Sequence, residues 1–167
     1  MTNRRNLLLT GAAAIGATGT AAWLVASLNE PVSASSEARF ELTRTDAEWR
    51  ALLTPAQYSV LRREGTERAF SSPLDREKRA GLFHCAGCDL PVYSSETKYD
   101  SRTGWPSFWA SLDGAVGTKT DRKLLLARTE VHCRRCGGHL GHVFDDGPPP
   151  TGKRHCLNGV ALKFVAA

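Results

Sequence analysis

The sequence predicts a mainly β domain of the α+β class, with short N-terminal helices and a structural zinc site made by four cysteines. Two observations predict it. From about Leu82 onward, short apolar runs alternate with Gly, Pro, Asp and Ser, which is typical of antiparallel sandwiches and open barrels. Two Cys-x-x-Cys pairs have the spacing of tetrahedral zinc ligands. The 167 residues suffice for one ordinary domain.

The beginning of the chain has the features of a Tat-type export signal. Arg4 and Arg5 precede a segment without charge that runs to Leu28, and Val32-Ser33-Ala34 resembles a small-residue cleavage site. The alternative is an uncleaved membrane anchor, because about 20 residues span a bilayer. We expect export to the periplasm, or membrane anchoring if cleavage does not occur. The chain then divides into a signal peptide at residues 1–34, a polar lead-in at 35–44 and a domain at 45–167.

Two short helices are predicted at the start of the domain. Thr45 and Glu48 have the spacing of a capping box, which predicts a helix to Leu53. The run Thr54-Pro55-Ala56-Gln57 predicts the start of a second helix, with proline at its first position, and Gly65 is expected to end it. We assign these helices a structural role only.

Short apolar runs separated by turn residues predict the strands. Pro148-Pro149-Pro150-Thr151-Gly152 predicts a stiff, extended loop before the last strand. Strands are expected at residues 81–83, 90–93, 123–127, 143–144 and 160–165.

The two Cys-x-x-Cys pairs are Cys85 with Cys88 and Cys133 with Cys136. Four thiolates leave no open position for water, so one Zn²⁺ bound here would be structural and not catalytic. Redox pairs and two disulfides are the alternatives. A redox pair is expected near a βαβ pattern, which this sequence lacks.

Cys156 is the one cysteine left over. Arg154 and Asn158 flank it at a spacing of two residues, so all three side chains would share one face of a strand. A guanidinium beside a thiol favours the reactive thiolate. The alternative is a buried cysteine that serves as a small hydrophobic residue.

His139 and His142 are candidates for proton transfer to or from this thiol. They would point to opposite faces of a regular strand, but Gly141 permits a bulge that turns both inward. Neutral imidazoles near a thiolate suit proton delivery. Trp105, in a Gly-Trp-Pro loop, is either an apolar wall of the site or a core residue.

The formal net charge of +5 is mild and its charges are interspersed. The sequence has no basic block with interleaved aromatic residues, so we expect no nucleic-acid partner. We expect a monomer. The same pattern of cysteines would also suit a zinc-ribbon interaction module without enzymatic activity, or a thiol peroxidase or sulfenic-acid sensor that uses Cys156.

Several motifs in order resemble one family, the zinc-bearing peptide-methionine (R)-S-oxide reductases. The resemblance runs from about Leu53 to Phe164, and it implies two antiparallel β-sheets with N-terminal helices. It also implies reduction of the R epimer of methionine sulfoxide, free or in oxidised proteins and peptides. The matching motifs, besides the two cysteine pairs, are Thr54-Pro55-x-Gln57-Tyr58-x-Val60, Gly65-Thr66-Glu67, Lys98-x-Asp100-Ser101, Gly104-Trp105-Pro106-Ser107-Phe108, His139-Leu140-Gly141-His142-Val143-Phe144 and Arg154-His155-Cys156-Leu157-Asn158.

The resemblance also implies a role for each site residue. Cys156 attacks the sulfoxide sulfur, and His142, with His139 beside it, donates a proton to the departing oxygen. The substrate methyl group is held by Trp105 and Phe144, and the thiolate is supported by Asn158 and Arg154.

Thr103 is the position at which this chain departs from the pattern. Many members of the family have a resolving cysteine there, and it forms a disulfide with the oxidised nucleophile. The resemblance therefore implies that the sulfenic acid of Cys156 is reduced by an external thiol. A thioredoxin-fold protein of the cell envelope or a small thiol would serve.

Overall fold

The structure is a computed structural model that describes residues 40–123 and 126–167. The predicted signal peptide at residues 1–34 and most of the lead-in lie outside this part. None of the helices in the described ranges is long and apolar enough to cross a membrane.

Both predicted helices are present, as α1 (Asp46–Leu52) and α2 (Pro55–Arg63). Each helix begins with a complete capping box. The backbone N–H of Thr45 donates to the carboxylate of Glu48 at 2.8 Å, and the backbone N–H of Thr54 donates to the side-chain oxygen of Gln57 at 3.0 Å. The left-handed residue that ends α2 is Glu64 (φ 54°), one position before the expected glycine. Gly65 is still required, because a Cβ there would lie 2.8 Å from the hydroxyl of Ser59.

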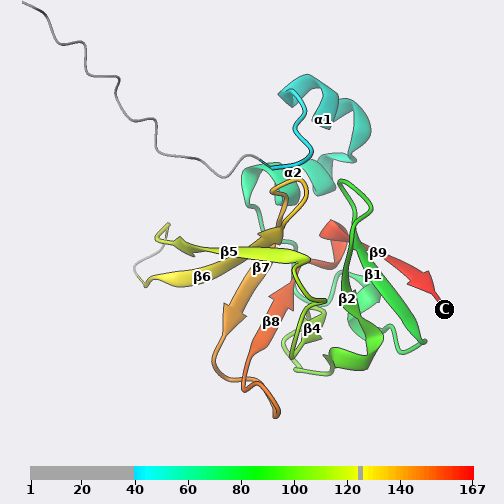
Figure 1. Cartoon of the computed structure of the whole chain (residues 1–167), viewed down its shortest axis with the longest axis vertical. Helices are drawn as coiled ribbons and strands as arrows, with labels where there is room; N and C mark the ends of the chain where they lie inside the picture. The colour runs from blue at the N-terminus through cyan, green and yellow to red at the C-terminus, as the bar shows by residue number, and fades with distance from the viewer. Residues whose placement is uncertain (1–39, 124–125) are drawn as a thin grey trace, which may run out of the picture. The chain divides into compact units, whose positions relative to one another are not determined.

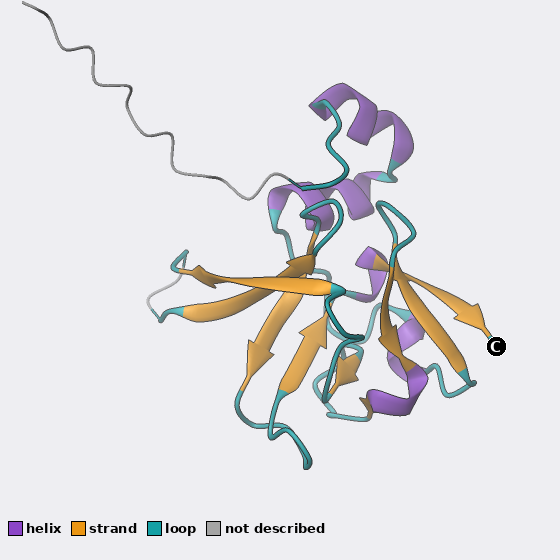
Figure 2. Ribbon diagram, in the orientation of Figure 1, coloured by secondary structure: helices purple, strands orange, loops and turns teal. Residues whose placement is uncertain are grey.

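Two antiparallel sheets form the body of the domain, which confirms the predicted fold class (Figures 1 and 2). The three-stranded sheet has the order β2-β1-β9, and the six-stranded sheet has the order β3-β4-β8-β7-β6-β5. The strands are β1 (Gly81–Cys85), β2 (Pro91–Ser94), β3 (Lys98–Tyr99), β4 (Ser107–Phe108), β5 (Val116–Asp121), β6 (Arg128–Cys133), β7 (His139–Phe144), β8 (Arg154–Leu157) and β9 (Leu162–Ala166). Short 3-10 helices are η1 (Pro73–Arg76), η2 (Ser95–Thr97) and η3 (Gly159–Ala161).

The strand expected at 123–127 is wrong. Its described residues, Lys123, Leu126 and Ala127, lie between β5 and β6 and belong to neither strand. The true strands on either side pair from Val116↔Cys133 to Asp121↔Arg128. Strand β5 is the polar outer strand of the six-stranded sheet, so its sequence lacks the apolar alternation that would have revealed it.

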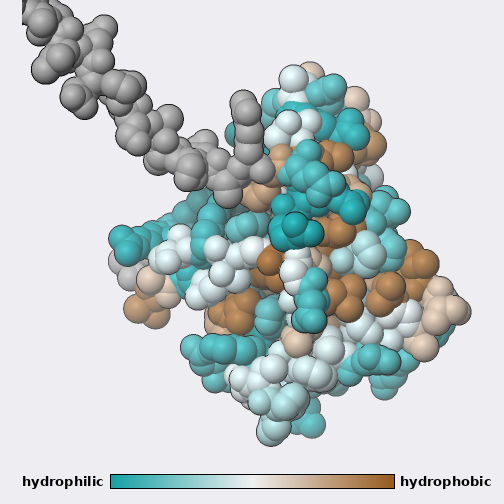
Figure 3. Space-filling model, viewed as in Figure 1, coloured by the Kyte–Doolittle hydropathy of each residue, from teal (hydrophilic) through white to brown (hydrophobic). Residues whose placement is uncertain are grey.

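The proline-rich loop also differs from its prediction. The segment from Pro148 to Gly152 closes as a turn, in which the N–H of Gly152 donates to the carbonyl of Pro148 at 3.0 Å. It precedes β8, which is not the last strand. This turn aligns β7 and β8 side by side, and Figure 3 shows it as part of a hydrophilic lower end of the molecule.

Aromatic side chains join the two sheets. Phe83 of β1 and Tyr93 of β2 both contact Phe108 of β4, with ring centroids 5.0 and 4.6 Å apart. All three are fully buried, and each such pair adds about 0.5–1.5 kcal/mol beyond the burial of area. His155 of β8 is paired with Phe108 across the sheet, and its ring lies near Tyr93. Its neighbour Cys156 therefore faces the opposite side of the sheet, away from this core.

Candidate functional site

The four paired cysteines come together as the sequence predicts. Their sulfurs all lie within 4.8 Å of one another, and the Cys85–Cys136 and Cys88–Cys133 separations are 3.7 and 3.4 Å. Tetrahedral zinc with Zn–S bonds of about 2.3 Å requires sulfurs about 3.8 Å apart, so the cluster fits such an ion. A metal ion here would join the end of β1, in one sheet, to the end of β6, in the other.

The two cysteine turns have the same backbone geometry. The residue after each pair is left-handed, Asp89 at φ 61° and Gly137 at φ 66°. The N–H of each donates to the carbonyl of the first cysteine of its pair, at 2.8 and 2.9 Å. This repeated turn directs both sulfurs of a pair to one side. All five cysteines of the chain lie in the described part, and no disulfide joins any of them there.

Cys156 lies on β8, an inner strand of the six-stranded sheet. It is half-buried, and its direct cross-strand partners are His142 of β7 and Ser107 of β4. Its sulfur is 3.9 Å from the hydroxyl of Thr103, the position at which the family resemblance implies a resolving cysteine in many members. The predicted nucleophile therefore sits on rigid structure, beside the expected proton-transfer residue.

The pKa of Cys156 is raised by burial, and this effect exceeds the opposing effects of Thr103 and Arg154. The guanidinium of Arg154 lowers the pKa of Cys156, as predicted, but the opposite effect of burial is larger. Arg154 is held by a two-point ion pair with Asp146, at 2.8 Å for both bonds, and lies 4.4 Å above the ring of Phe144. In the free protein the thiol is consequently protonated at neutral pH. Asp146 was not predicted from the sequence.

A bulge in β7 brings the two histidines to one side, as predicted. His139 is opposite His132 and Gly141 is opposite Val131, so the extra residue is Leu140. The two site histidine rings, of His139 and His142, are then 5.3 Å apart. Glycine is required next to the bulge, because a Cβ on Gly141 would lie 2.1 Å from the carbonyl oxygen of Cys156.

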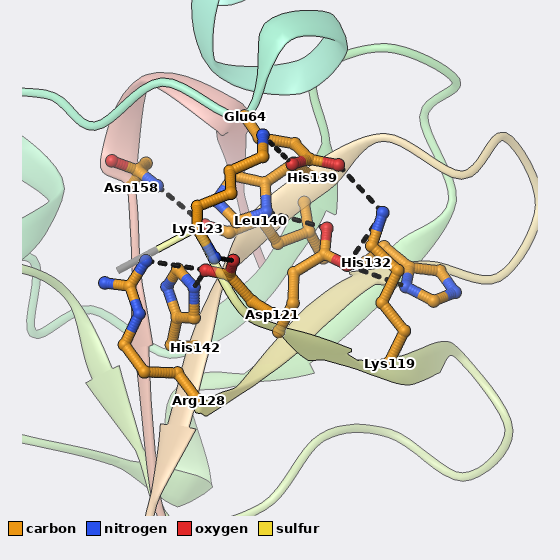
Figure 4. A network of polar contacts seen from close by, with 11 residues as sticks. Glu64, Lys119, Asp121, Lys123, Arg128, His132, His139, Leu140, His142 and Asn158 are labelled. Carbon is orange, nitrogen blue, oxygen red and sulfur yellow. Dashed lines mark hydrogen bonds and ion pairs between the residues drawn. The ribbon is translucent and has the colours of Figure 1, made fainter. Parts of the chain in front are cut away.

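Asp121, at the end of β5, holds the ring of His142 (Figure 4). Its Oδ2 accepts hydrogen bonds from Nε2 of His142 at 2.8 Å and from the guanidinium of Arg128 at 2.6 Å. The N–H of Lys123 donates to the other oxygen at 2.9 Å. The pKa of Asp121 is lowered first by this backbone bond and then by His142, so the carboxylate is ionised.

Glu130 of β6 holds the second histidine in a similar way. Its carboxylate lies 2.8 Å from Nδ1 of His139, and both side chains are buried. Burial alone would raise the pKa of Glu130, but its contacts with His132 and His139 and the charge of Lys119 outweigh burial, so the pKa is lowered. Neither carboxylate was predicted, because cross-strand register brings them to the site and no local motif marks them.

Glu67 connects two predicted site residues from a distant part of the chain. Its carbonyl accepts a hydrogen bond from the indole N–H of Trp105 at 3.2 Å, and its N–H donates to Oδ1 of Asn158 at 2.9 Å. Its carboxylate accepts from the N–H groups of Gly159 and Val160, at 2.6 and 2.9 Å. Trp105 is half-buried beside the site and is not among the buried core residues.

Asn158, which is expected to support the thiolate, makes its hydrogen bonds to neighbouring segments of the chain. It is 4% exposed, and its amide group donates to the carbonyl of Leu140 at 3.1 Å while its oxygen accepts from Glu67. These bonds fix the chain that follows β8 against β7. Among the described residues the amide forms no hydrogen bond with the sulfur of Cys156.

A half-buried thiol lies beside two carboxylate-held histidines, in a two-sheet domain with a four-cysteine cluster that could hold a metal ion. This arrangement is suited to thiol-based redox chemistry. The model of the SelR domain family matches residues 53–166. A "Peptide methionine sulfoxide reductase MsrB" of Pseudomonas putida is 52% identical over 74% of this chain and 94% of the relative. Proteins of the same name from Agrobacterium fabrum and Methanosarcina barkeri are 49% and 51% identical, over 74% and 72% of this chain and 93% and 86% of their own lengths. The chain therefore belongs to the SelR family of peptide methionine sulfoxide reductases.

Proposed function

We propose that the protein reduces the R epimer of methionine sulfoxide, in oxidised peptides and proteins, by attack of the Cys156 sulfur on the sulfoxide sulfur. One observation carries the proposal. Cys156 is the only cysteine outside the metal-binding cluster, and it lies directly opposite His142 on the neighbouring strand. Directly opposed side chains have Cβ atoms about 4.5–5.5 Å apart, so the thiol and the imidazole are neighbours on one face of the sheet.

The reaction transfers one oxygen atom from substrate to enzyme. The bond between the methionine sulfur and its oxygen breaks, and Cys156 becomes a sulfenic acid while methionine leaves. Cysteine sulfur loses two electrons and methionine sulfur gains two, and the thiol proton ends on the transferred oxygen. A sulfoxide reacts poorly until its oxygen is protonated, so an acid must be placed together with the nucleophile. His142 fills that role in the proposal, and His139 lines the same side.

Apolar side chains at the rim suit the methyl group of the substrate. Phe144 is opposite Arg154 in the β7–β8 pair, two residues from His142, and the ion pair of Arg154 with Asp146 fixes the guanidinium above its ring. Trp105 is held by Glu67 in the Gly-Trp-Pro loop. We propose that these two aromatic residues contact the methyl group.

Turnover requires a second molecule. Thr103 lies 3.9 Å from the sulfur and offers a hydroxyl in place of a thiol, and the other four cysteines belong to the four-cysteine cluster. We propose a single structural Zn²⁺ at that cluster and reduction of the sulfenic acid by a thioredoxin-like protein or a small thiol. We further propose that residues 1–34 direct export to the periplasm and that the mature protein is a monomer.

The test is turnover of resolved R and S sulfoxide substrates by the zinc-loaded mature protein, with several thiol reductants. We expect R turnover, its loss in Cys156→Ser, and unchanged zinc content in that variant. After excess sulfoxide without reductant, a dimedone-type reagent should trap one sulfenic acid. Preference for the S epimer, or an intramolecular disulfide at Cys156, would contradict the proposal.

A further inference from the structure

The two ring nitrogens of His142 have different surroundings. Nε2 lies 2.8 Å from the carboxylate of Asp121, whereas Nδ1 has no hydrogen-bond partner among the residues that the structure describes. An ionised carboxylate can only accept hydrogen bonds, so the proton in this contact belongs to Nε2. Asp121 is itself fixed, because it is only 9% exposed and also accepts from Arg128 and from the backbone of Lys123.

We propose that Asp121 is a positioning residue for sulfoxide reduction: by accepting the Nε2 proton of His142 it fixes the tautomer in which Nδ1 carries a proton from Cys156 to the sulfoxide oxygen. This inference rests on the proposed function and adds to it a residue and a route for the proton. Asp121 does not touch the substrate, and it acts through the imidazole.

The protonation states of the free protein fit this route. Burial raises the pKa of Cys156 and lowers the pKa of His142, so the resting pair is a thiol beside a neutral imidazole. The free lone pair on Nδ1 accepts the thiol proton as the sulfur attacks, and the same proton then passes to the sulfoxide oxygen. No proton is taken from or given to solvent in this step. The opposite tautomer, with the proton on Nδ1, could not accept from the thiol.

Two charges act on His142 with opposite sign. Asp121 raises its pKa through the hydrogen bond, and Arg128 lowers it through its positive charge. The charged or titratable groups that face the imidazole are Asp121 from β5, Arg128 and Glu130 from β6, His139 from β7 and Cys156 from β8. Replacing Asp121 and replacing Arg128 should therefore move the titration of His142 in opposite directions.

The experiment compares zinc-loaded wild type, Asp121→Asn, Arg128→Gln and the exposed control Asp113→Asn. Long-range ¹H–¹⁵N spectra without substrate report the tautomer and titration of His142, and kinetics report kcat and KM. We expect a proton on Nε2 in wild type, a lower His142 pKa in Asp121→Asn, and a higher one in Arg128→Gln. We also expect kcat of Asp121→Asn to fall by about 10²-fold or more, with a smaller change in KM, because acid–base catalysis contributes that much.

Three outcomes would overturn the inference: a proton on Nδ1 in wild type, pKa shifts of the same sign in both variants, or kcat of Asp121→Asn within about twofold of wild type. The wild-type spectrum needs no variant, so it decides the tautomer even if a variant folds poorly. Absence of sulfoxide turnover in wild type would instead refute the proposed function, while leaving the tautomer result readable.

Discussion

Glu67 allows a quantitative test of how a residue outside the site shapes it. Its carboxylate accepts hydrogen bonds from the backbone N–H groups of Gly159 and Val160, the two residues that directly follow Asn158. Hydrogen bonds to charged groups contribute about 1.5–3 kcal/mol each when buried, and Glu67 is partly exposed. We therefore expect Glu67→Ala to lower the free energy of unfolding by about 2–4 kcal/mol.

The functional effect should accompany this loss. The N–H and carbonyl of Glu67 still reach Asn158 and Trp105 in the alanine variant, but the segment after β8 loses its anchor. If about 1.4 kcal/mol of transition-state stabilisation is lost with this anchor, kcat/KM falls about tenfold. Glu67→Gln keeps one acceptor oxygen for the two N–H groups, so it should lose roughly half as much stability.

Urea unfolding followed by circular dichroism, together with steady-state kinetics, measures both quantities. The matched control is Glu96→Ala, which removes an exposed carboxylate. Unfolding free energies of Glu67→Ala and the control that agree within about 0.5 kcal/mol would refute the role assigned to the carboxylate. Loss of stability with unchanged kcat/KM would limit that role to folding.

Three further outcomes follow from the geometry. Removing the proposed zinc with a chelator should lower Tm by about 10 °C or more in a differential scanning experiment, because an ion at this cluster would join the two sheets. An unchanged Tm would contradict a structural role. In Thr103→Cys, a thiol replaces a hydroxyl 3.9 Å from the Cys156 sulfur, so sulfoxide treatment should yield an intramolecular disulfide that non-reducing mass spectrometry detects. Arg154→Met should raise the pKa of Cys156, because the guanidinium lowers it. The pH profile of iodoacetamide alkylation should then move to higher pH, whereas Lys153→Met should leave it in place.

Local sequence signals predicted those parts of the fold that local chemistry determines. The capping boxes at Thr45 and Thr54 involve residues three apart, and both helices begin where predicted. The four-cysteine cluster was predictable because the spacing within each pair sets its turn, although 44 residues separate the pairs. Cys156 was identified as the candidate nucleophile because it is the one cysteine outside the two pairs.

The polar partners of the site could not be predicted in this way. Asp121 reaches His142 because β5, β6 and β7 are paired in one register, and Glu67 reaches Asn158 across 91 residues of sequence. Nothing in the flanking residues marks either contact. The strand β5 itself was missed because its polar residues lie at the edge of the sheet, where apolar alternation is not needed. The net rise in the pKa of Cys156 also depends on burial, which a sequence does not display.

The place of Cys156 on an inner strand has a consequence for the order of events. In the proposed reaction, substrate and reductant must both reach the same half-buried sulfur, from the face of the sheet opposite the aromatic core. The two therefore exclude each other, and each must leave before the other arrives. Because the proposed sulfenic acid is formed and reduced in separate steps, we expect ping-pong kinetics, with parallel double-reciprocal plots. A high concentration of either partner should then inhibit the half-reaction of the other.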